Sequence, residues 1–181
     1  MRIVPNIISF FRICLVPLFA IIYFSDIHET KIFAVLVYAL ASFSDFLDGF
    51  LARRYKASSN LGKVLDPLGD KLMTITAMIC ITIDGIIPLW AVLIVGIKEI
   101  LMAAGGFVMH KVAQVDIPQS NLLGKTSTVV FFLICVALML FRSLSPAMAI
   151  MLISFAIALT VFALAVYLKT YVTVMKNRGR E

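Results

Sequence analysis

Four aspartates stand in two closely spaced pairs between positions 45 and 70 of this chain. Asp45 and Asp48 are three residues apart, and Asp66 and Asp70 are four residues apart. Residues three or four apart lie on the same face of an α-helix, so each pair shares a face of its own helix. A turn of about a dozen residues between the pairs would let the two helices run antiparallel, which would bring all four carboxylates together.

Such a cluster of carboxylates requires a source of positive charge. Four carboxylates at close range repel one another strongly where the dielectric constant is low, so either some are protonated or cations neutralise them. Carboxylate oxygens are hard ligands that favour Mg²⁺, Mn²⁺ or Ca²⁺ over zinc or copper. Two divalent metals held a few ångströms apart form a clamp for in-line phosphoryl displacement. The aspartates therefore predict a metal-dependent phosphoryl-transfer site.

Small residues and one arginine accompany the aspartates. Gly49 and Ala52 lie on or beside the face of the first pair, and Gly62 precedes the second pair. We expect these three residues to leave room for a nucleotide against the helices. Arg53 would supply a fixed cation for the phosphates of that nucleotide.

The composition of the chain places these residues in a membrane. Its 181 residues are 62% hydrophobic, and a soluble domain is only about half apolar, so the excess must face lipid. A helix that crosses the bilayer core needs roughly 20 apolar residues. Six segments approach this length: Ile7–Phe24, Ile32–Ala52, Asp66–Ile83, Pro88–Met109, Leu122–Phe141 and Pro146–Leu168. We expect an all-α integral membrane protein with six transmembrane helices, forming one domain over residues 1–181.

The distribution of positive charge predicts the orientation of these helices. Lysines and arginines gather at one set of helix ends, whereas the opposite ends carry little positive charge beyond Lys31 and Arg142. The positive-inside rule places the basic ends, both termini and the aspartates on the cytosolic side of a cell inner membrane. The net charge of +6 suits a surface of anionic lipids. Nucleic acid is not an expected partner, because an embedded chain has little soluble surface.

Ionisable residues inside the predicted spans favour a functional interpretation. Each costs at least a few kcal/mol at the centre of a lipid-facing helix, so these side chains must face one another, a cavity or an ion. Taken alone, Asp66 before Pro67 is equally typical of a helix N-cap. The residues concerned are Arg12, Asp45, Asp48, Asp66, Asp70, Lys71, Lys98 and Glu99.

The aspartate stretch resembles the signature of a known family. The pattern D-x-x-D-G-x-x-A-R-x8-G-x-x-x-D-x-x-x-D is typical of the CDP-alcohol phosphotransferases, and its eight specified positions all occur from Asp45 to Asp70. The start of the chain, Pro5-Asn6-Ile-Ile-Ser9-Phe-Phe-Arg12, is similar to the opening P-N-x-x-T-x-x-R of bacterial phosphatidylglycerophosphate synthases. Ser9 stands where threonine is usual.

This resemblance implies a reaction and a role for each aspartate. In the family, CDP-diacylglycerol loses CMP when an alcohol attacks its diacylglycerol-side phosphorus. The family pattern makes Asp45, Asp48 and Asp66 ligands of two divalent cations, Mg²⁺ or Mn²⁺, and places Asp70 near the second metal. It also makes Asp70 the general base, whereas composition and spacing alone leave open which aspartate is the base. The resemblance further implies a homodimer.

Two lysines are candidates for binding the acceptor. Lys98 precedes Glu99 where the synthases carry Arg-Glu, and Lys125 stands in a segment similar to their G-K-x-K-T. Ser127 replaces the second lysine of that segment, and Gly105-Gly106 lies near where those enzymes carry another arginine. An ion pair with Glu99 would explain Lys98 without a bound acceptor. A position at the membrane interface would explain Lys125 in the same way.

Several functions are compatible with this pattern. The preferred one is transfer of a phosphatidyl group to glycerol 3-phosphate. A cardiolipin-type synthase would use phosphatidylglycerol, which carries one negative charge and needs fewer cations than glycerol 3-phosphate. A small cation-coupled transporter would explain intramembrane carboxylates but not Gly49, Ala52, Arg53 and Gly62 at fixed spacing. In an intramembrane prenyltransferase the aspartate motifs would lie much farther apart.

Overall fold

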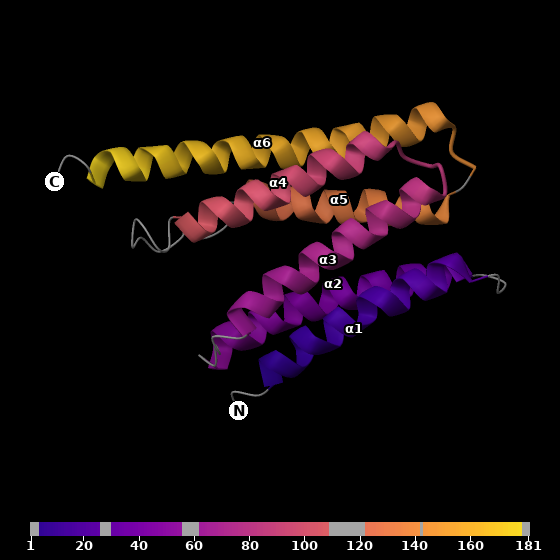
Figure 1. Cartoon of the computed structure of the whole chain (residues 1–181), viewed down its shortest axis with the longest axis horizontal. Helices are drawn as coiled ribbons and strands as arrows, with labels where there is room; N and C mark the ends of the chain where they lie inside the picture. Colours follow the sequence, from indigo (N-terminus) through magenta and orange to yellow (C-terminus); the bar gives the residue numbers. More distant parts are fainter. Residues whose placement is uncertain (1–3, 26–29, 56–61, 109–121, 142, 179–181) are drawn as a thin grey trace. The chain divides into compact units, whose positions relative to one another are not determined.

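The structure is a computed structural model that describes residues 4–25, 30–55, 62–108, 122–141 and 143–178. Side chains are described for residues 10–25, 30–44, 69–105, 122–141 and 143–169. Throughout these ranges the regular structure is helical (Figure 1). The helices are α1 (Val4–Phe24), α2 (Thr30–Tyr55), α3 (Gly62–Ile83), α4 (Leu89–Val108), α5 (Leu122–Leu140) and α6 (Pro146–Arg178).

Each of the six predicted segments corresponds to one helix, which confirms the all-α prediction for the described ranges. The largest difference is at the end of the chain, where α6 continues about ten residues beyond the predicted limit at Leu168. The predicted limit was the end of the apolar run, where the helix would leave the hydrocarbon core of the bilayer. The helix itself does not stop there, because the residues that follow include no proline or glycine before Gly179.

The contacts divide the chain into two compact units. The first unit contains α1, α2 and α3, together with Met139–Arg142. The second contains α4, most of α5, and α6. Each unit is described by itself below.

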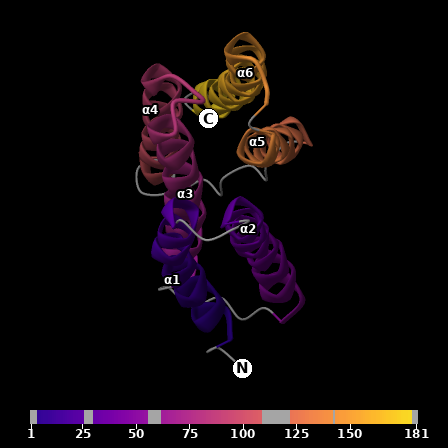
Figure 2. The same ribbon diagram turned by 90° about the vertical axis from the view of Figure 1, so that its right-hand side faces the viewer.

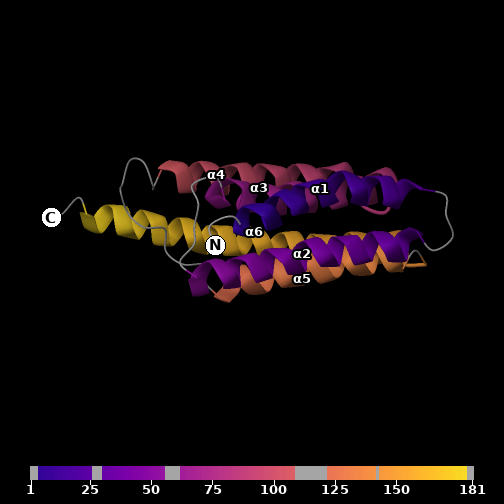
Figure 3. The same cartoon turned by 90° about the horizontal axis from the view of Figure 1, so that it is seen from below.

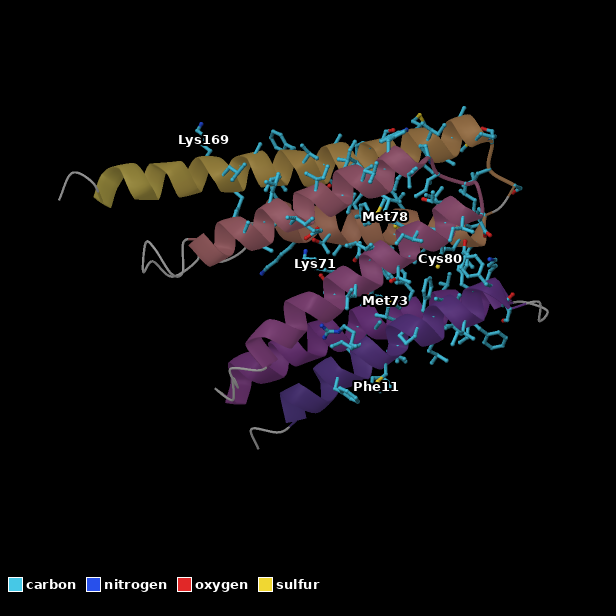
Figure 4. The ribbon with its side chains drawn as sticks, in the orientation of Figure 1. Phe11, Lys71, Met73, Met78, Cys80 and Lys169 are labelled. Atoms are coloured by element: carbon cyan, nitrogen blue, oxygen red, sulfur yellow. The ribbon has the colours of Figure 1, made fainter. Side chains whose placement is uncertain are left out.

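The first unit is held together by α1, which packs against both α2 and α3 (Figure 2). Buried residues recur at helical spacing on each helix, as expected for an apolar stripe that faces a core. In Figure 4, Phe11 projects outward from α1, whereas Met73 belongs to the buried stripe of α3. The buried stripes are Leu15, Phe19 and Tyr23 on α1, Ala34, Tyr38 and Ala41 on α2, and Met73, Ala77 and Ile81 on α3.

The second unit contains α4, most of α5, and α6, whose axes run roughly along one direction in Figure 3. Its helices also carry buried stripes, and one polar residue lies in each of them. Glu99 follows Ala91 and Val95 on α4, Ser127 precedes Phe131 and Cys135 on α5, and Thr160 lies among Ile153, Ala156 and Leu164 on α6. A buried polar side chain costs free energy unless it is hydrogen-bonded, so these positions are informative about the second unit.

Two helices in the described ranges are long and apolar enough to cross a membrane. They are Leu122–Leu140 of α5 and Pro146–Lys169 of α6. Nineteen residues of helix extend about 28 Å, close to the thickness of a bilayer core. Only 28% of the tested α5 residues and 33% of the tested α6 residues are buried within the protein. That low burial sets both helices apart from the largely buried core helices of soluble proteins.

Candidate active site

The backbone brings the two predicted aspartate pairs to one end of the first unit. Asp45 and Asp48 lie in the second half of α2, whereas Asp66 and Asp70 lie in the first half of α3. Only residues 56–61 separate the two helices, which contact each other. The helices run in opposite directions, because the start of α2 meets the end of α3 through the Lys31–Asp84 ion pair. The predicted antiparallel arrangement is therefore confirmed.

Of these carboxylates, the structure describes the side chain of Asp70 alone, and it is half-buried. The other predicted ligands, Asp45, Asp48 and Asp66, are placed on their helices, but their side chains fall outside the described residues. The same holds for the predicted nucleotide-binding residues Gly49, Ala52, Arg53 and Gly62. Among the side chains that are described, no three His, Cys, Asp or Glu residues cluster in a metal-binding arrangement. The metal site remains a prediction supported by helix placement.

Arg12 is a buried cation close to Asp70 in the first unit. Its side chain is 1% exposed and lies against Gly69, the residue before Asp70. A Cβ atom at Gly69 would lie 3.2 Å from Cδ of Arg12 and 3.6 Å from Cγ1 of Ile13. The absence of a side chain at Gly69 therefore lets α1 and its arginine approach the aspartate-bearing face of α3 closely.

Arg12 was not among the predicted site residues, although the sequence contains a signal for it. It is the last residue of the N-terminal segment that resembles P-N-x-x-T-x-x-R. Its packing brings a guanidinium to α3 at Gly69, one residue before Asp70. Arg12 therefore packs on the helix that carries Asp66 and Asp70.

The predicted acceptor residue Lys98 forms an ion pair with its neighbour in the chain. The distance from Nζ of Lys98 to Oε1 of Glu99 is 2.6 Å, and the two side chains are 14% and 9% exposed. This is the intrahelical pair that was considered as the alternative for Lys98. The pairing keeps two largely buried charges close together on α4 and leaves the acceptor role of Lys98 as a prediction.

The segment around Lys125 forms the first two turns of α5. The side chain of Lys125 is exposed. The hydroxyl of Ser127 donates to the carbonyl oxygen of Gly124 at 2.9 Å, and the hydroxyl of Thr128 donates to the same oxygen at 3.0 Å. Ser127, which replaces a lysine of the resembled segment, is buried and already hydrogen-bonded to its own helix. It therefore supplies no positive charge where that lysine would.

Comparison with known proteins supports the resemblance over most of the chain. The family described as CDP-alcohol phosphatidyltransferase matches residues 2–174. A protein named cardiolipin synthase (CMP-forming) from Streptomyces coelicolor is 35% identical over 128 residues, which cover 69% of this chain and 59% of that protein.

Two further relatives are named CDP-diacylglycerol–glycerol-3-phosphate 3-phosphatidyltransferase. The protein from Blochmanniella floridana is 39% identical over 79 residues, which cover 44% of this chain and 42% of that protein. The protein from Escherichia coli K12 is 34% identical over 79 residues, which cover 44% of this chain and 43% of that protein. The matched part of this chain therefore spans between about two fifths and three fifths of the length of these relatives. Because the family match extends over nearly all of its residues, the chain belongs to the CDP-alcohol phosphatidyltransferase family.

Proposed function

We propose that the chain transfers a phosphatidyl group from CDP-diacylglycerol to glycerol 3-phosphate and releases CMP. The observation that carries this proposal is the complete family signature from Asp45 to Asp70, distributed over two antiparallel helices that bring both aspartate pairs to one end. The names of the relatives from B. floridana and E. coli support glycerol 3-phosphate as the acceptor.

The donor set of the site fits two divalent cations. All four candidate ligands are carboxylates, the hard oxygen donors that Mg²⁺ and Mn²⁺ prefer. Their spacing and helix placement put Asp45, Asp48 and Asp66 at the same end of the first unit as Asp70. When bound, the metals would supply positive charge to the phosphates and so favour displacement at phosphorus.

The residues of the chain would act on both substrates. Gly49, Ala52 and Gly62 would allow the nucleotide to lie against α2 and α3, while Arg53 would pair with a phosphate oxygen. Asp70 would accept the proton of the acceptor hydroxyl. The hydroxyl oxygen would then form a bond to the diacylglycerol-side phosphorus as the bond from that phosphorus to CMP breaks. The products are the phosphatidylated alcohol and CMP.

The proposed topology follows from the charge pattern and the helices together. All six helices would cross the inner membrane, with both termini and the aspartate end in the cytoplasm. Basic residues at that end would contact anionic lipids. The single domain predicted over residues 1–181 and the homodimer are part of the same proposal. The family match over residues 2–174 supports the single domain.

The alternative acceptor is phosphatidylglycerol, and specific observations favour keeping it. Lys98 is paired with Glu99, and Ser127 stands where the resembled segment has a lysine, which suits an acceptor with one negative charge better than a doubly charged phosphate. In addition, the match to the S. coelicolor cardiolipin synthase extends over 128 residues, against 79 residues for the glycerol-3-phosphate enzymes.

The decisive experiment is a transfer assay on purified protein in lipid nanodiscs. CDP-diacylglycerol and Mn²⁺ are supplied with glycerol 3-phosphate or, separately, with phosphatidylglycerol, and CMP release and the product lipid are measured. The proposal expects CMP release that depends on metal and on glycerol 3-phosphate. Turnover with phosphatidylglycerol alone would establish the alternative. Substrate movement across a liposome without CMP release would instead favour a transporter.

A further inference from the structure

A polar cluster joins the three helices of the first unit at the end opposite the aspartates. It consists of Tyr23 near the end of α1, Lys31 at the start of α2, and Asp84 directly after α3. The ammonium of Lys31 lies 3.1 Å from Oδ2 of Asp84, and the hydroxyl of Tyr23 donates to the same oxygen at 2.8 Å. One carboxylate therefore links three helices. We refer to these three residues as the outer clamp.

The outer clamp has a defined geometry. The ammonium of Lys31 also donates to the carbonyl oxygen of Tyr23 at 2.9 Å and lies 3.4 Å from the centroid of its ring. The side chains of Lys31 and Asp84 are 22% and 19% exposed, and Tyr23 is buried against Phe19 at a centroid distance of 5.7 Å. A largely desolvated pair with additional hydrogen bonds holds its partners in one arrangement.

The spacing along the two helices connects the outer clamp to the aspartates. Asp45 lies 14 residues after Lys31 on α2, and Asp70 lies 14 residues before Asp84 on α3. Fourteen residues of helix rise about 21 Å and make just under four turns. When Lys31 lies opposite Asp84 on antiparallel helices, Asp45 lies at the same height along the helix axes as Asp70. Because 14 residues make nearly four whole turns, Asp45 and Asp70 also lie on nearly the same helix faces as Lys31 and Asp84. Asp48 is level with residue 67, next to Asp66.

We propose that Lys31 and Asp84 are positioning residues that set the register of α2 and α3 and so align the two aspartate pairs. This inference rests on the proposed function for its use of the metals. A slip of one helical turn would move the pairs about 5.4 Å relative to each other. Metal–oxygen distances in such sites are about 2.0–2.6 Å, so a slip of that size separates ligands that must share a metal. The direct contacts between α2 and α3 are sparser than their contacts with α1, which increases the need for a specific link.

The test measures register and metal affinity separately from activity. The three native cysteines are first replaced by alanine. Spin labels are then attached to cysteines that replace Phe43 on α2 and Leu72 on α3. Both positions are exposed, and the same register places them at equal height along the two helices. Their separation is measured by double electron–electron resonance without metal. Mn²⁺ affinity is measured in the unlabelled chain by electron paramagnetic resonance. The variants are Lys31→Met, Asp84→Asn and the charge-conserving Lys31→Arg, with Thr82→Ala as the control. Thr82 is two residues from the clamp, and its hydroxyl donates to the carbonyl oxygen of Met78 in its own helix at 2.8 Å.

If the outer clamp sets the register, the distance between the two spin labels should have one narrow distribution in the wild type. Lys31→Met should broaden it or add a second maximum displaced by about one helical turn, and should weaken Mn²⁺ binding at least about tenfold. Lys31→Arg should restore both, and Thr82→Ala should change neither. If Lys31→Met does not fold, the same two measurements on Asp84→Asn decide whether the ion pair sets the register. This variant removes the ion pair and retains an oxygen that can accept from the hydroxyl of Tyr23.

Two results would overturn the inference. One is an unchanged distance and unchanged Mn²⁺ affinity in folded Lys31→Met and Asp84→Asn protein. The other is a lowered melting temperature without a change in either measurement, which would make the clamp merely stabilising. Absence of metal-dependent CMP release by the wild type would refute the proposed function, while the distance measurement would still decide the register.

Discussion

The two units each contain a partly buried lysine–carboxylate pair, and the pairs differ in what they connect. Lys31 and Asp84 are 53 residues apart in sequence and join the start of α2 to the end of α3. Lys98 and Glu99 are adjacent on α4. An adjacent pair cannot determine how helices are arranged, because both partners move with the same helix. The first pair therefore carries positional information, whereas the second brings two opposite charges together within one helix.

This difference suggests separate uses for the two pairs. Burying charges costs free energy that the attraction within the pair does not always offset. In the first unit, the benefit is a defined register for α2 and α3. In the second unit, the benefit would be a charged group ready to exchange Glu99 for an anionic ligand. Breaking the two pairs should therefore affect different measured quantities.

The largest effect is expected at the aspartates that the first unit is proposed to align. Asp45→Asn removes a charged metal ligand, and metal stabilisation of the transferring phosphate is worth several kcal/mol. We expect kcat to fall about a hundredfold to a thousandfold, with the melting temperature little changed. The check is the rate of CMP release at saturating substrates. EDTA should abolish the wild-type rate, and excess Mn²⁺ should restore it. Near wild-type turnover in the variant would contradict the two-metal site.

Breaking the pair between helices should give the next largest effect. Lys31→Met leaves the largely buried carboxylate of Asp84 without its ammonium, which should cost about 2–3 kcal/mol of unfolding free energy. The quantity to measure is the melting temperature in detergent, compared with Lys98→Met. We expect the Lys31 variant to be the less stable of the two, because it also loses a link between helices. Equal stability of both variants would remove the distinction between the pairs.

Breaking the pair within α4 should instead alter acceptor binding. A charge-assisted contact to phosphate is worth roughly 1.5–3 kcal/mol, so Lys98→Met should raise the acceptor KM about tenfold to a hundredfold and leave the donor KM nearly unchanged. Glu99→Gln is the matched variant, since it frees Lys98 from a neutralising charge and should not raise the acceptor KM. Lys125→Ala tests the second predicted acceptor lysine in the same way. Unchanged KM values in both lysine variants would limit the lysines to structural roles.

The smallest expected effect is a difference in stability between alanine substitutions at two glycines. Gly69 in the first unit is in close contact with Arg12, whereas Gly96 in the second unit has no described neighbour where a side chain would begin. Gly69→Ala would place a methyl group 3.2 Å from Cδ of Arg12, so the buried arginine would have to shift, at a cost of about 1 kcal/mol. Gly96→Ala on α4 meets nothing within 4 Å and should be neutral or slightly stabilising, because alanine favours helix. Melting temperatures of the two variants provide the check. A stabilised Gly69→Ala protein would refute the close approach of Arg12.

The sequence predicted the helices well because their signals are local. Apolar runs such as Leu122–Phe141 end at polar or helix-breaking residues, so the observed limits at Leu122 and Leu140 lie close to the prediction. The spacing of Asp45, Asp48, Asp66 and Asp70 likewise predicted two helices with one face each, and α2 and α3 carry them.

The features that the sequence did not predict depend on contacts between distant segments. Nothing local to Lys31 indicates that it meets Asp84, because the pair depends on how α2 and α3 align. Arg12 was noted as a charge at membrane depth, but its packing against Gly69 required the position of α1 relative to α3. By contrast, the Lys98–Glu99 pair was anticipated as an alternative, since its partners are adjacent.

The central claim is attack by an acceptor hydroxyl on the diacylglycerol-side phosphorus, and an oxygen label tests it directly. Glycerol 3-phosphate carrying ¹⁸O in its attacking hydroxyl is incubated with CDP-diacylglycerol, Mn²⁺ and the purified wild-type protein, and both products are analysed by mass spectrometry. The account predicts one ¹⁸O in the phosphatidylated product and none in CMP, with no product when EDTA is present. Unlabelled lipid product, ¹⁸O in CMP, or no CMP release with metal and acceptor present would contradict it.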